Sequence, residues 1–526
     1  MGASITIMSI LSDRLSEEIL QARQRVYTVG EPTPLQRLNL PGIQAPVYAK
    51  REDLGPIRAY KWRGAFNCMA ALSQEARDKG IVAASAGNHA QGVALAARVL
   101  NCHATIFMPR STPEVKQTEV RRHGGRHVKI MLHGDCYDET AAAAHEYTET
   151  HGCTFVHPYD DLVTMAGQGT LADEVVMSGE GPFDRAYVAI GGGGLAASVA
   201  CWLKKFWIYI KVIGVEGIDQ ASMKTSIQQG RRVNLDYFFF FCFVTAVHIP
   251  GELTYPLCRE LVDEFVTVTN NEVCQAIRAM WESSRVVPEP SGAMSLAGFL
   301  KQWNRGEVKP EEKSFVVISG AKMNLTHLTQ IARQAGIGNH ETRYLRISMD
   351  SKRGQVLKYL RHIPQDTTLV DVQYGKTEGN TQHPVFGIAA SDEDLDTIRT
   401  TLKKKGIEFE DISEDDDVRF RMIHYQPELC QHPLFVHIEF PERAGAFLDF
   451  MERIADLASL CYFNYTYTGE RVGRALVGME FDTAEDRETI RKRMSAFSKN
   501  IIRSIREISP EAFQRIMGSR QLTGNH

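Results

Sequence analysis

The chain has 526 residues, too many for one hydrophobic core, so two or three domains are expected. Apolar residues make up 43% and charged residues 24%, and the formal net charge of −4 gives no reason to expect a nucleic acid or a membrane surface as a partner. The ten cysteines show no C-x-x-C pair or metal spacing, and the N-terminus carries Asp13, Glu17 and Glu18 without a long apolar stretch. We therefore expect a cytoplasmic protein with reduced thiols.

Short apolar runs alternate with helical patterns from about residue 45 to about residue 325, which predicts an α/β domain with a doubly wound parallel sheet. The predicted strands are Ile81–Ala84, Ala104–Met108, His127–Leu132, Thr154–Val156, Ala186–Ile190, Val212–Val215 and Phe315–Ile318. Helices are predicted at Val93–Leu100 and Tyr137–His151. The apolar run Tyr237–Val247 is too short to span a bilayer and predicts a buried strand. A ligand crevice is expected at the carboxyl ends of the parallel strands.

Lys61 lies between Tyr60 and Trp62 at the start of an apolar helical pattern. A lysine held among aromatic rings is desolvated, which lowers its pKa and leaves a neutral amine able to form a Schiff base. The commoner role of a lysine beside aromatic residues is that of a surface residue with its charge in water. Lys61 is a candidate nucleophile only together with the turns described next.

The first turn follows the strand Ile81–Ala84 and runs through Ser85, Ala86, Gly87, Asn88 and His89 into a helix. Its backbone N–H groups, the Asn88 amide and the Ser85 hydroxyl could hold an anion. An ordinary helix N-cap with Asn or Ser looks similar. His89 is expected to orient this loop rather than to act as a base.

The second turn consists of four glycines, Gly191, Gly192, Gly193 and Gly194, between a buried strand and a helix that starts near Leu195. Bare backbone N–H groups at the positive end of a helix suit a phosphate monoester. The alternative is a flexible turn, which seldom needs four glycines. No dinucleotide fingerprint or P-loop is present. A third turn, Ser319-Gly320-Ala321, follows the strand Phe315–Ile318.

An internal repeat follows residue 340. Adding 91 to Leu345, Ile347, Gly354, Leu357 and Ile363 gives Val436, Ile438, Gly445, Leu448 and Ile454, and the same offset carries Val372, Tyr374 and Gly387 onto Phe463, Tyr465 and Gly478. A strand, a turn, a helix and further strands are therefore predicted twice. The copies could be regulatory modules or a duplicated dimerisation domain, and we favour regulation. The acidic run Glu414–Asp417 is most simply a solvated loop between them.

Together these motifs resemble the fold-type II (tryptophan-synthase-β-like) pyridoxal-phosphate (PLP) enzymes, in particular the allosteric, biosynthetic branch of the threonine ammonia-lyase family. The matching segments are Lys61 with its aromatic neighbours, Ser85–Gly92, Gly191–Leu195, Glu289–Ala293 and Ser319–Ala321, with Thr33–Leu35 and Ala166–Thr170 in support. The resemblance implies a PLP-dependent catalytic domain over residues 1–339 and two α+β ACT-like regulatory modules over 340–424 and 425–526. It also implies deamination of threonine to 2-oxobutanoate and ammonia on the route to isoleucine, and a homotetramer.

The resemblance assigns roles to single residues. Lys61 would bind PLP covalently and act as the base at Cα of the substrate. Residues Gly191–Gly194 and Leu195 would bind the phosphate, Asn88 the ring oxygen, and Ser319 the pyridine nitrogen. The backbone from Ser85 to His89 would hold the substrate carboxylate. Tyr374 and Tyr465 are candidate contacts of an effector, isoleucine or valine, or simply interface residues.

The chain also departs from the family pattern. Ala59, Phe243-Val244 and Lys322 stand where relatives carry a serine, an acidic residue with glycine, and an asparagine. Glu289 could lie near the cofactor ring or cap a helix. Glu216 resembles a metal-ligand glutamate of the serine racemase relatives, but its acidic companion is missing, so no metal is predicted. An enzyme acting on serine or another β-substituted amino acid, and a non-catalytic amino-acid sensor, remain alternatives.

Overall fold

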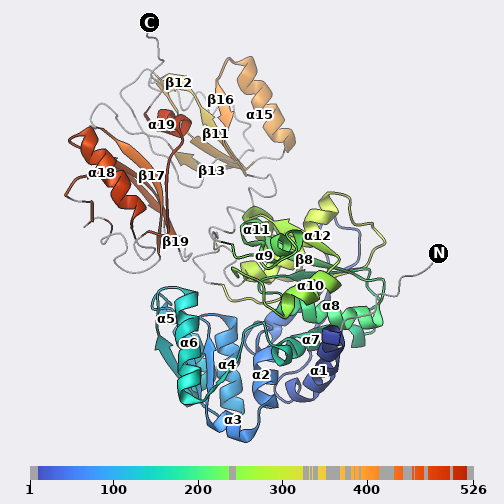
Figure 1. The fold of residues 1–526 in the computed structure, drawn as a ribbon. Coiled ribbons are helices and arrows are strands. Elements are labelled where there is room, and N and C mark those ends of the chain that lie inside the picture. Colours follow the sequence, from blue (N-terminus) through green and yellow to red (C-terminus); the bar gives the residue numbers. More distant parts are fainter. Residues whose placement is uncertain are drawn as a thin grey trace. The chain divides into compact units, whose positions relative to one another are not determined.

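The computed structural model describes residues 10–235 and 245–323, and, further along, 328, 331, 335, 342–350, 368–373, 381–383, 385–389, 392–413, 432–441, 450, 453–454, 456–466, 472–497 and 502–517. The chain divides into two compact units, residues 1–323 and 324–526. We call residues 1–323 the catalytic unit, after the domain that the family resemblance implies there, and residues 324–526 the C-terminal unit, and each is described by itself (Figure 1). The boundaries predicted at 339 and at 424 lie outside the described residues.

The elements of the catalytic unit are mostly those that the sequence predicts. Its helices are α1 (Ile10–Val26), α2 (Trp62–Ala71), α3 (Gln74–Asp78), α4 (Asn88–Val99), α5 (Glu114–Gly124), α6 (Tyr137–His151), α7 (Leu162–Met177), α8 (Gly194–Phe206), α9 (Ser222–Gln228), α10 (Thr254–Leu261), α11 (Asn270–Ser284) and α12 (Pro290–Asn304). Its strands are β1 (Leu35–Leu38), β2 (Val47–Arg51), β3 (Ile81–Ala84), β4 (Ala104–Met108), β5 (Val128–Leu132), β6 (Thr154–Phe155), β7 (Arg185–Ala189), β8 (Lys211–Gly217), β9 (Glu264–Val268) and β10 (Ser314–Ile318). All seven predicted strands and both predicted helices are confirmed, within a few residues at their ends.

Three strands were missed, and one predicted strand cannot be compared. Each of the missed strands β1, β2 and β9 carries two polar or charged residues within four or five positions, and β2 ends in the buried cations Lys50 and Arg51. Such strands lack the apolar run that marks a buried strand. Most of Tyr237–Val247 lies outside the described residues.

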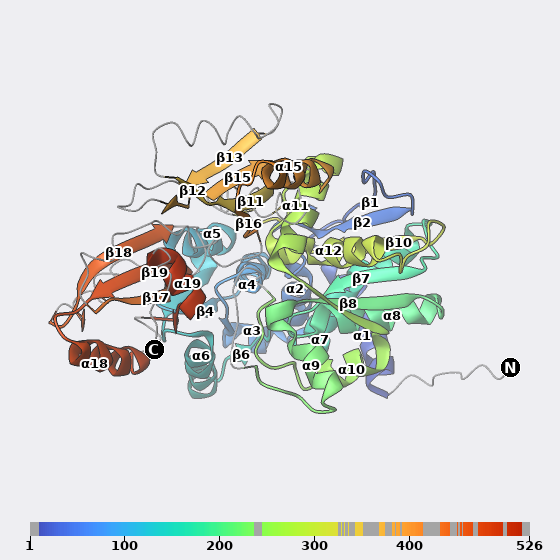
Figure 2. The same cartoon turned by 90° about the horizontal axis from the view of Figure 1, so that it is seen from above.

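Two sheets organise the catalytic unit (Figure 2). The larger has the order β1-β2-β10-β7-β8-β9, parallel except for β1, and the smaller has the order β5-β4-β3-β6 and is wholly parallel. Side chains alternate across the smaller sheet: Ile81 and Ala83 pack with the α2 and α4 side chains, and Val82 and Ala84 pack with those of α6. Parallel strands covered on both faces in this way are the doubly wound arrangement that was predicted.

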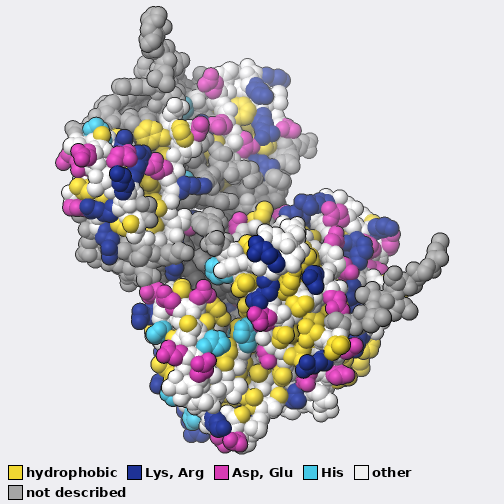
Figure 3. Space-filling view, in the orientation of Figure 1, with side chains coloured by type: hydrophobic (Ala, Val, Ile, Leu, Met, Phe, Trp, Pro, Cys, Tyr) yellow, Lys and Arg dark blue, Asp and Glu magenta, His cyan; other side chains and the backbone are white. Residues whose placement is uncertain are grey.

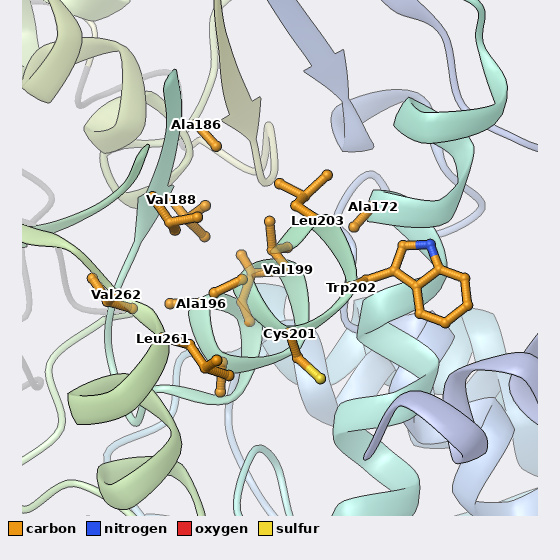
Figure 4. Close-up of a cluster of buried hydrophobic side chains, with 14 of the residues drawn as sticks. Ala172, Ala186, Val188, Ala196, Val199, Cys201, Trp202, Leu203, Leu261 and Val262 are labelled. Carbon is orange, nitrogen blue, oxygen red and sulfur yellow. The ribbon is translucent and has the colours of Figure 1, made fainter. Parts of the chain in front are cut away.

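Helix α8 lies at the centre of the largest core cluster (Figure 4). Its residues Val199 and Leu203 are fully buried with Ala186 and Val188 of β7 and with Leu261 of α10. Because the helix is packed along its length, its N-terminal end, next to the glycine run, is held in place.

The C-terminal unit contains the predicted repeat. Its elements are β11 (Thr342–Ile347), β12 (Met349–Asp350), β13 (Thr368–Gln373), β14 (Thr381–Gln382), β15 (Val385–Ala389), α15 (Asp392–Lys404), β16 (Phe409–Asp411), β17 (Leu434–Pro441), β18 (Ser459–Thr466), β19 (Val472–Glu480), α18 (Ala484–Ser495), β20 (Ser504–Glu507) and α19 (Pro510–Met517). The sheets β13-β15-β11-β16 and β18-β19-β17-β20 have the same order, with each strand in the place of its counterpart.

The two copies also share their register. Gly387 pairs with Tyr344 and Asp371, and Gly478 pairs with Phe435 and Tyr462, each partner again 91 positions further on. A bulge interrupts β13 between Leu369 and Asp371, and β18 at the equivalent place, between Leu460 and Tyr462. The offset read from the sequence is therefore confirmed in three dimensions.

The surface of each unit carries both charge signs. On the face shown in Figure 3, Lys and Arg side chains are intermixed with Asp and Glu side chains over the part that is described. Within the described ranges, no helix has the length and apolar character needed to cross a membrane.

Candidate active site

Lys61 stands at the N-terminal end of α2, where three parts of the catalytic unit meet. The neighbouring Tyr60 N–H donates to the Ser319 carbonyl at 3.1 Å, which ties the lysine segment to the end of β10. A Cβ at Gly92 of α4 would lie 3.1 Å from the Lys61 carbonyl oxygen. The Lys61 Nζ donates to the Pro158 carbonyl at 2.7 Å, in the loop after β6.

The surroundings of Lys61 favour a neutral amine. Burial lowers the pKa of Lys61 to about 8. Its Nζ lies 5.3 Å from the centre of the Tyr60 ring. The Trp62 ring, in contrast, lies against Gly30 and Gly55, so the predicted setting between two rings is only half right. Consecutive residues at a helix start point in different directions, and sequence adjacency could not show this.

The four glycines form a tight turn from β7 into α8. Gly193 precedes the helix with φ +98°, a conformation that side chains rarely adopt. A Cβ at Gly192 would meet the Tyr159 ring, and one at Gly194 would lie 2.7 Å from the Tyr159 carbonyl oxygen. Only bare backbone fits here, at the positive end of a buried helix, and this environment suits a phosphate ester. Leu195 lies in the first turn of α8 and is buried.

The predicted carboxylate loop leads from β3 into α4. Ser85, Ala86 and Gly87 are partly exposed, and the Ser85 hydroxyl accepts the Gly87 N–H at 3.2 Å. Asn88 and His89 are buried. Burial, with the charge of Lys61 as a second cause, lowers the pKa of His89 to about 3, and its Nε2 bonds the Val156 carbonyl at 2.9 Å. His89 is thus a neutral residue that orients the loop, as its sequence context suggests.

Asn88 and Ser319 are joined to the N-terminal end of α12. The Asn88 Nδ2 donates to Glu289 Oε1 at 2.8 Å. The Ser319 hydroxyl donates to the Ser291 carbonyl at 3.4 Å and is buried. Burial raises the pKa of Glu289 to about 7, although the bond from Asn88 opposes this. Lys61, Asn88 and Ser319 are far apart in the sequence. Hydrogen bonds made by these residues, or by residues next to them in the sequence, link the three segments.

Sequence reasoning missed the loop His157–Asp161, which connects the lysine to the glycines. Pro158 bonds Lys61, and Tyr159 covers Gly192 and Gly194. The Asp160 carboxylate accepts the N–H groups of Glu252, Leu253 and Thr254 at the start of α10, and the Thr254 hydroxyl donates to the Gly192 carbonyl. The loop follows the carboxyl end of the predicted strand Thr154–Val156. Ligands bind at the carboxyl ends of the strands in such sheets, so this position could have marked the loop as part of the site.

The remaining predicted residues are Glu216, Tyr374, Tyr465 and the Phe243-Val244 pair. The buried Glu216 carboxylate accepts the N–H groups of Met223 and Lys224 at 2.9 Å and 2.8 Å. In the part of the chain that the structure describes, no three His, Cys, Asp or Glu side chains come together in a way that could hold a metal ion. Tyr465 belongs to β18, whereas Tyr374 and the Phe243-Val244 pair lie outside the described residues.

Comparisons with known proteins identify the family of the chain. Residues 26–320 match the pyridoxal-phosphate dependent enzyme family, and residues 430–504 match the C-terminal regulatory domain of threonine dehydratase. The chain is 36% identical over 480 residues to "L-threonine dehydratase biosynthetic IlvA" of Burkholderia multivorans, covering 90% of this chain and 94% of the relative. The corresponding protein of Escherichia coli is 33% identical, with 89% and 91% covered.

Solved structures of related enzymes are similar to the catalytic unit. The processed form of threonine deaminase isoform 2 from Solanum lycopersicum superposes with a TM-score of 0.59 and 37% identity, over 62% of this chain and 89% of that one. The serine racemase of maize superposes with a TM-score of 0.55 and 28% identity, over 62% of this chain and 98% of that one. The chain therefore belongs to the fold-type II PLP-dependent ammonia-lyases, in the biosynthetic threonine dehydratase family with its C-terminal regulatory domain.

Proposed function

We propose that this protein deaminates L-threonine to 2-oxobutanoate and ammonia, the committed step towards isoleucine. The observation that carries the proposal is the meeting of Lys61, the glycine turn, Asn88 and Ser319 in one site of a chain whose relatives are threonine dehydratases. The substrate is taken from those relatives.

The residues fit bound PLP in the following way. The N–H groups from Gly191 to Leu195 would bind the phosphate, since only backbone is available there. Asn88 would orient the ring oxygen, and the Ser319 hydroxyl would face the pyridine nitrogen. When bound, PLP supplies an electron sink for charge that develops at Cα of the amino acid.

The chain's own groups supply binding and proton transfer. The segment Ser85–Gly87, whose residues are partly exposed, would with Asn88 and His89 hold the α-carboxylate of the substrate. The Lys61 amine would hold the cofactor and then remove the proton from Cα, for which a pKa of about 8 is suitable. Ser319 offers a hydroxyl where some enzymes have a carboxylate, and a hydroxyl does not keep the pyridine nitrogen protonated. This favours elimination of the substrate hydroxyl over reactions that need a longer-lived negative charge at Cα.

The C-terminal unit is proposed to bind a branched-chain amino acid, isoleucine with valine as its opponent, and to change the activity. The match of residues 430–504 to a regulatory domain supports this. Tyr374 and Tyr465 remain the candidate effector contacts. We further propose a cytoplasmic homo-oligomer, a tetramer by family resemblance. Three exposed apolar residues support an interface between subunits: Phe206, which ends α8, and Ile208 and Tyr209, which follow it.

The test is a keto-acid assay with threonine, serine and other β-substituted amino acids. Threonine should give the highest kcat/KM, and Lys61→Ala should abolish turnover of every substrate. Borohydride reduction followed by peptide mapping should place the pyridoxyl group on Lys61. A label on another lysine would overturn the site, and a preference for serine would overturn the substrate alone. A protein that binds PLP without turnover of any of these would be a sensor.

A further inference from the structure

Lys322 is an unusual cation beside the proposed cofactor site. It follows the Ser319-Gly320-Ala321 turn, where the family resemblance places an asparagine. Its Nζ is buried and has no hydrogen-bond partner among the residues that the structure describes. A buried ammonium without a partner is costly, so a nearby charge is expected to balance it.

The acidic group joined to the Lys322 segment is Glu289. This side chain is 2% exposed, and its carboxylate accepts the Asn88 Nδ2 at 2.8 Å and the backbone N–H of Lys322. The Glu289 backbone N–H in turn donates to the Gly320 carbonyl at 3.1 Å. The lysine, the glutamate and the asparagine thus form one chain of contacts from the end of β10 through the start of α12 to the start of α4.

Among the described residues, few other charged groups lie near the contacts that join Lys322, Glu289 and Asn88. Helix α5 contributes Glu119 and Arg122 near Lys322, and Lys116 near Glu289. Its His123 has a pKa lowered to about 4, by burial first and then by Lys322, so it is neutral at pH 7. The buried Tyr60, just before α2, faces Glu289 and has a raised pKa, so it is also neutral.

Lys322 and Glu289 exchange protons with water close to neutral pH. Burial raises the pKa of Glu289 to about 7, while Asn88, Lys322 and Lys116 oppose the rise. Burial lowers the pKa of Lys322 to about 8, while Glu289 and Glu119 oppose the fall and Arg122 adds to it. Both groups are therefore charged near neutral pH, and Glu289 takes up a proton as the pH falls whereas Lys322 loses one as it rises.

We propose that Lys322 is a positioning residue for the cofactor site: its ammonium keeps Glu289 as a carboxylate, and the carboxylate fixes the side-chain amide of Asn88. A hydrogen bond to a carboxylate is about twice as strong as one to a neutral acceptor, so the orientation of Asn88 depends on this charge. With its Nδ2 held by Glu289, Asn88 presents its remaining polar atoms to the ring. The inference rests on the proposed function only in placing Asn88 at PLP.

The experiment follows the absorbance spectrum of PLP bound to the full-length protein as a function of pH. Lys322→Met and Lys322→Asn should move the spectral midpoint of the Glu289 transition upward by about one pH unit, because a neighbouring positive charge is lost. They should also raise the dissociation constant of PLP near pH 7.5 by roughly two- to tenfold, as expected for a weakened hydrogen bond. Lys322→Arg should restore both quantities.

Two controls make the test specific. Lys309→Met removes an exposed lysine and should leave the titration unchanged. In a Glu289→Gln background, Lys322→Met should shift nothing further, because the charge on which it acts is gone. Spectra of Lys322→Met that overlay the wild type at every pH would overturn the proposal while leaving the cofactor site intact. A wild-type protein that binds no PLP would overturn both, and failure of the threonine assay with PLP bound would leave this inference standing.

Discussion

At the scale of single residues, the proposed cofactor site contains two unusual environments, a partly buried lysine and a glycine with positive φ. In the proposed mechanism, Lys61 captures the cofactor through the neutral form of its amine, which burial favours. Gly193 needs a conformation and a space that no other residue fits. Each environment leads to a measurable consequence.

The first consequence concerns pH. Because burial lowers the pKa of Lys61 to about 8, the neutral amine becomes the main form above this pH rather than above its usual range near 10.5. The rate at which the apoprotein captures PLP should therefore rise with pH to a midpoint near 8, measured by stopped-flow absorbance. A midpoint near the usual lysine value would show that the amine is not desolvated.

The second consequence concerns Gly193. A Cβ there would lie 2.6 Å from Met223 Cε and 2.9 Å from Thr254 Cβ, at φ +98°. Gly193→Ala should cost about 1 to 3 kcal/mol in stability, and Gly193→Val should remove most of the bound PLP. PLP content by absorbance and the thermal midpoint are the measurements.

Gly152 is the matched control for Gly193. It ends α6 with φ +64°, and a Cβ there meets nothing within 4 Å. Gly152→Ala should show the conformational cost of about 1 kcal/mol with full PLP content. If Gly193→Val bound as much PLP as Gly152→Ala, the phosphate-binding role of the glycine turn would be wrong.

At the scale of elements, a buried network of ion pairs joins β2 and α7 to α2, the helix that begins just after Lys61. Arg63 of α2 donates to Glu52 at 2.8 Å and 2.9 Å and to Glu174 of α7, and Lys50 of β2 bonds Glu174 as well. Thr33 adds its hydroxyl at 2.5 Å from Glu52. Arg63 lies two residues after Lys61, so the network fixes the start of the helix that carries the lysine.

Glu52→Gln is expected to destabilise the catalytic unit by about 3 to 5 kcal/mol at pH 7, because it leaves Arg63 and Lys50 buried with too little negative charge. Burial alone would raise the pKa of Glu52, but Arg63 and Lys50 hold it below its usual value. A depressed folded-state pKa contributes stability above the unfolded pKa, and this stability is lost as the pH falls. The difference between wild type and variant should therefore shrink below about pH 4.

The free energy of unfolding of the catalytic unit can be followed by tryptophan fluorescence, since all five tryptophans of the chain lie in this unit. The control is Glu75→Gln, an exposed glutamate whose change should stay within about 0.5 kcal/mol. A loss of less than about 1 kcal/mol for Glu52→Gln would mean that the network contributes little to the stability of the unit.

At the scale of the whole molecule, the catalytic unit is followed by two copies of one α+β module. Each copy has its own core, built from Leu345, Ile347 and Phe386 in the first and from Val436, Ile438 and Phe450 in the second. Regulation requires that a ligand of these modules bind two states of the protein with different affinity.

Isoleucine should therefore shift the threonine saturation curve of the full chain and not that of a chain truncated after Met323. Gly478→Val offers a test within the full chain, because a Cβ at this position would lie 2.6 Å from Phe435 and 2.7 Å from Tyr462. The variant should keep its basal activity and lose at least half of the isoleucine response, measured as the threonine concentration at half-saturation. An equal isoleucine effect on the full and truncated chains would refute the regulatory role.

The sequence by itself determined seven of the ten strands that the structure describes in the catalytic unit, and it determined the repeat. Seven parallel strands, the turns at their carboxyl ends and the 91-residue offset are local patterns of apolar spacing and glycine, and the structure has all of them. The candidates Asn88, Gly191–Gly194 and Ser319 could be named because each lies in such a turn, and Lys61 because it lies between two aromatic residues at the start of a helical pattern.

Only the tertiary structure decided what surrounds these residues. It turned Trp62 away from Lys61, brought Pro158 and Tyr159 between the lysine and the glycines, and joined Asn88, Glu289 and Lys322 through contacts that span more than two hundred positions. The pKa values of Lys61, Glu289 and Lys322 follow from burial and from neighbours on other elements. Spacing along the chain predicts neither these contacts nor these pKa values, because both depend on packing between distant segments.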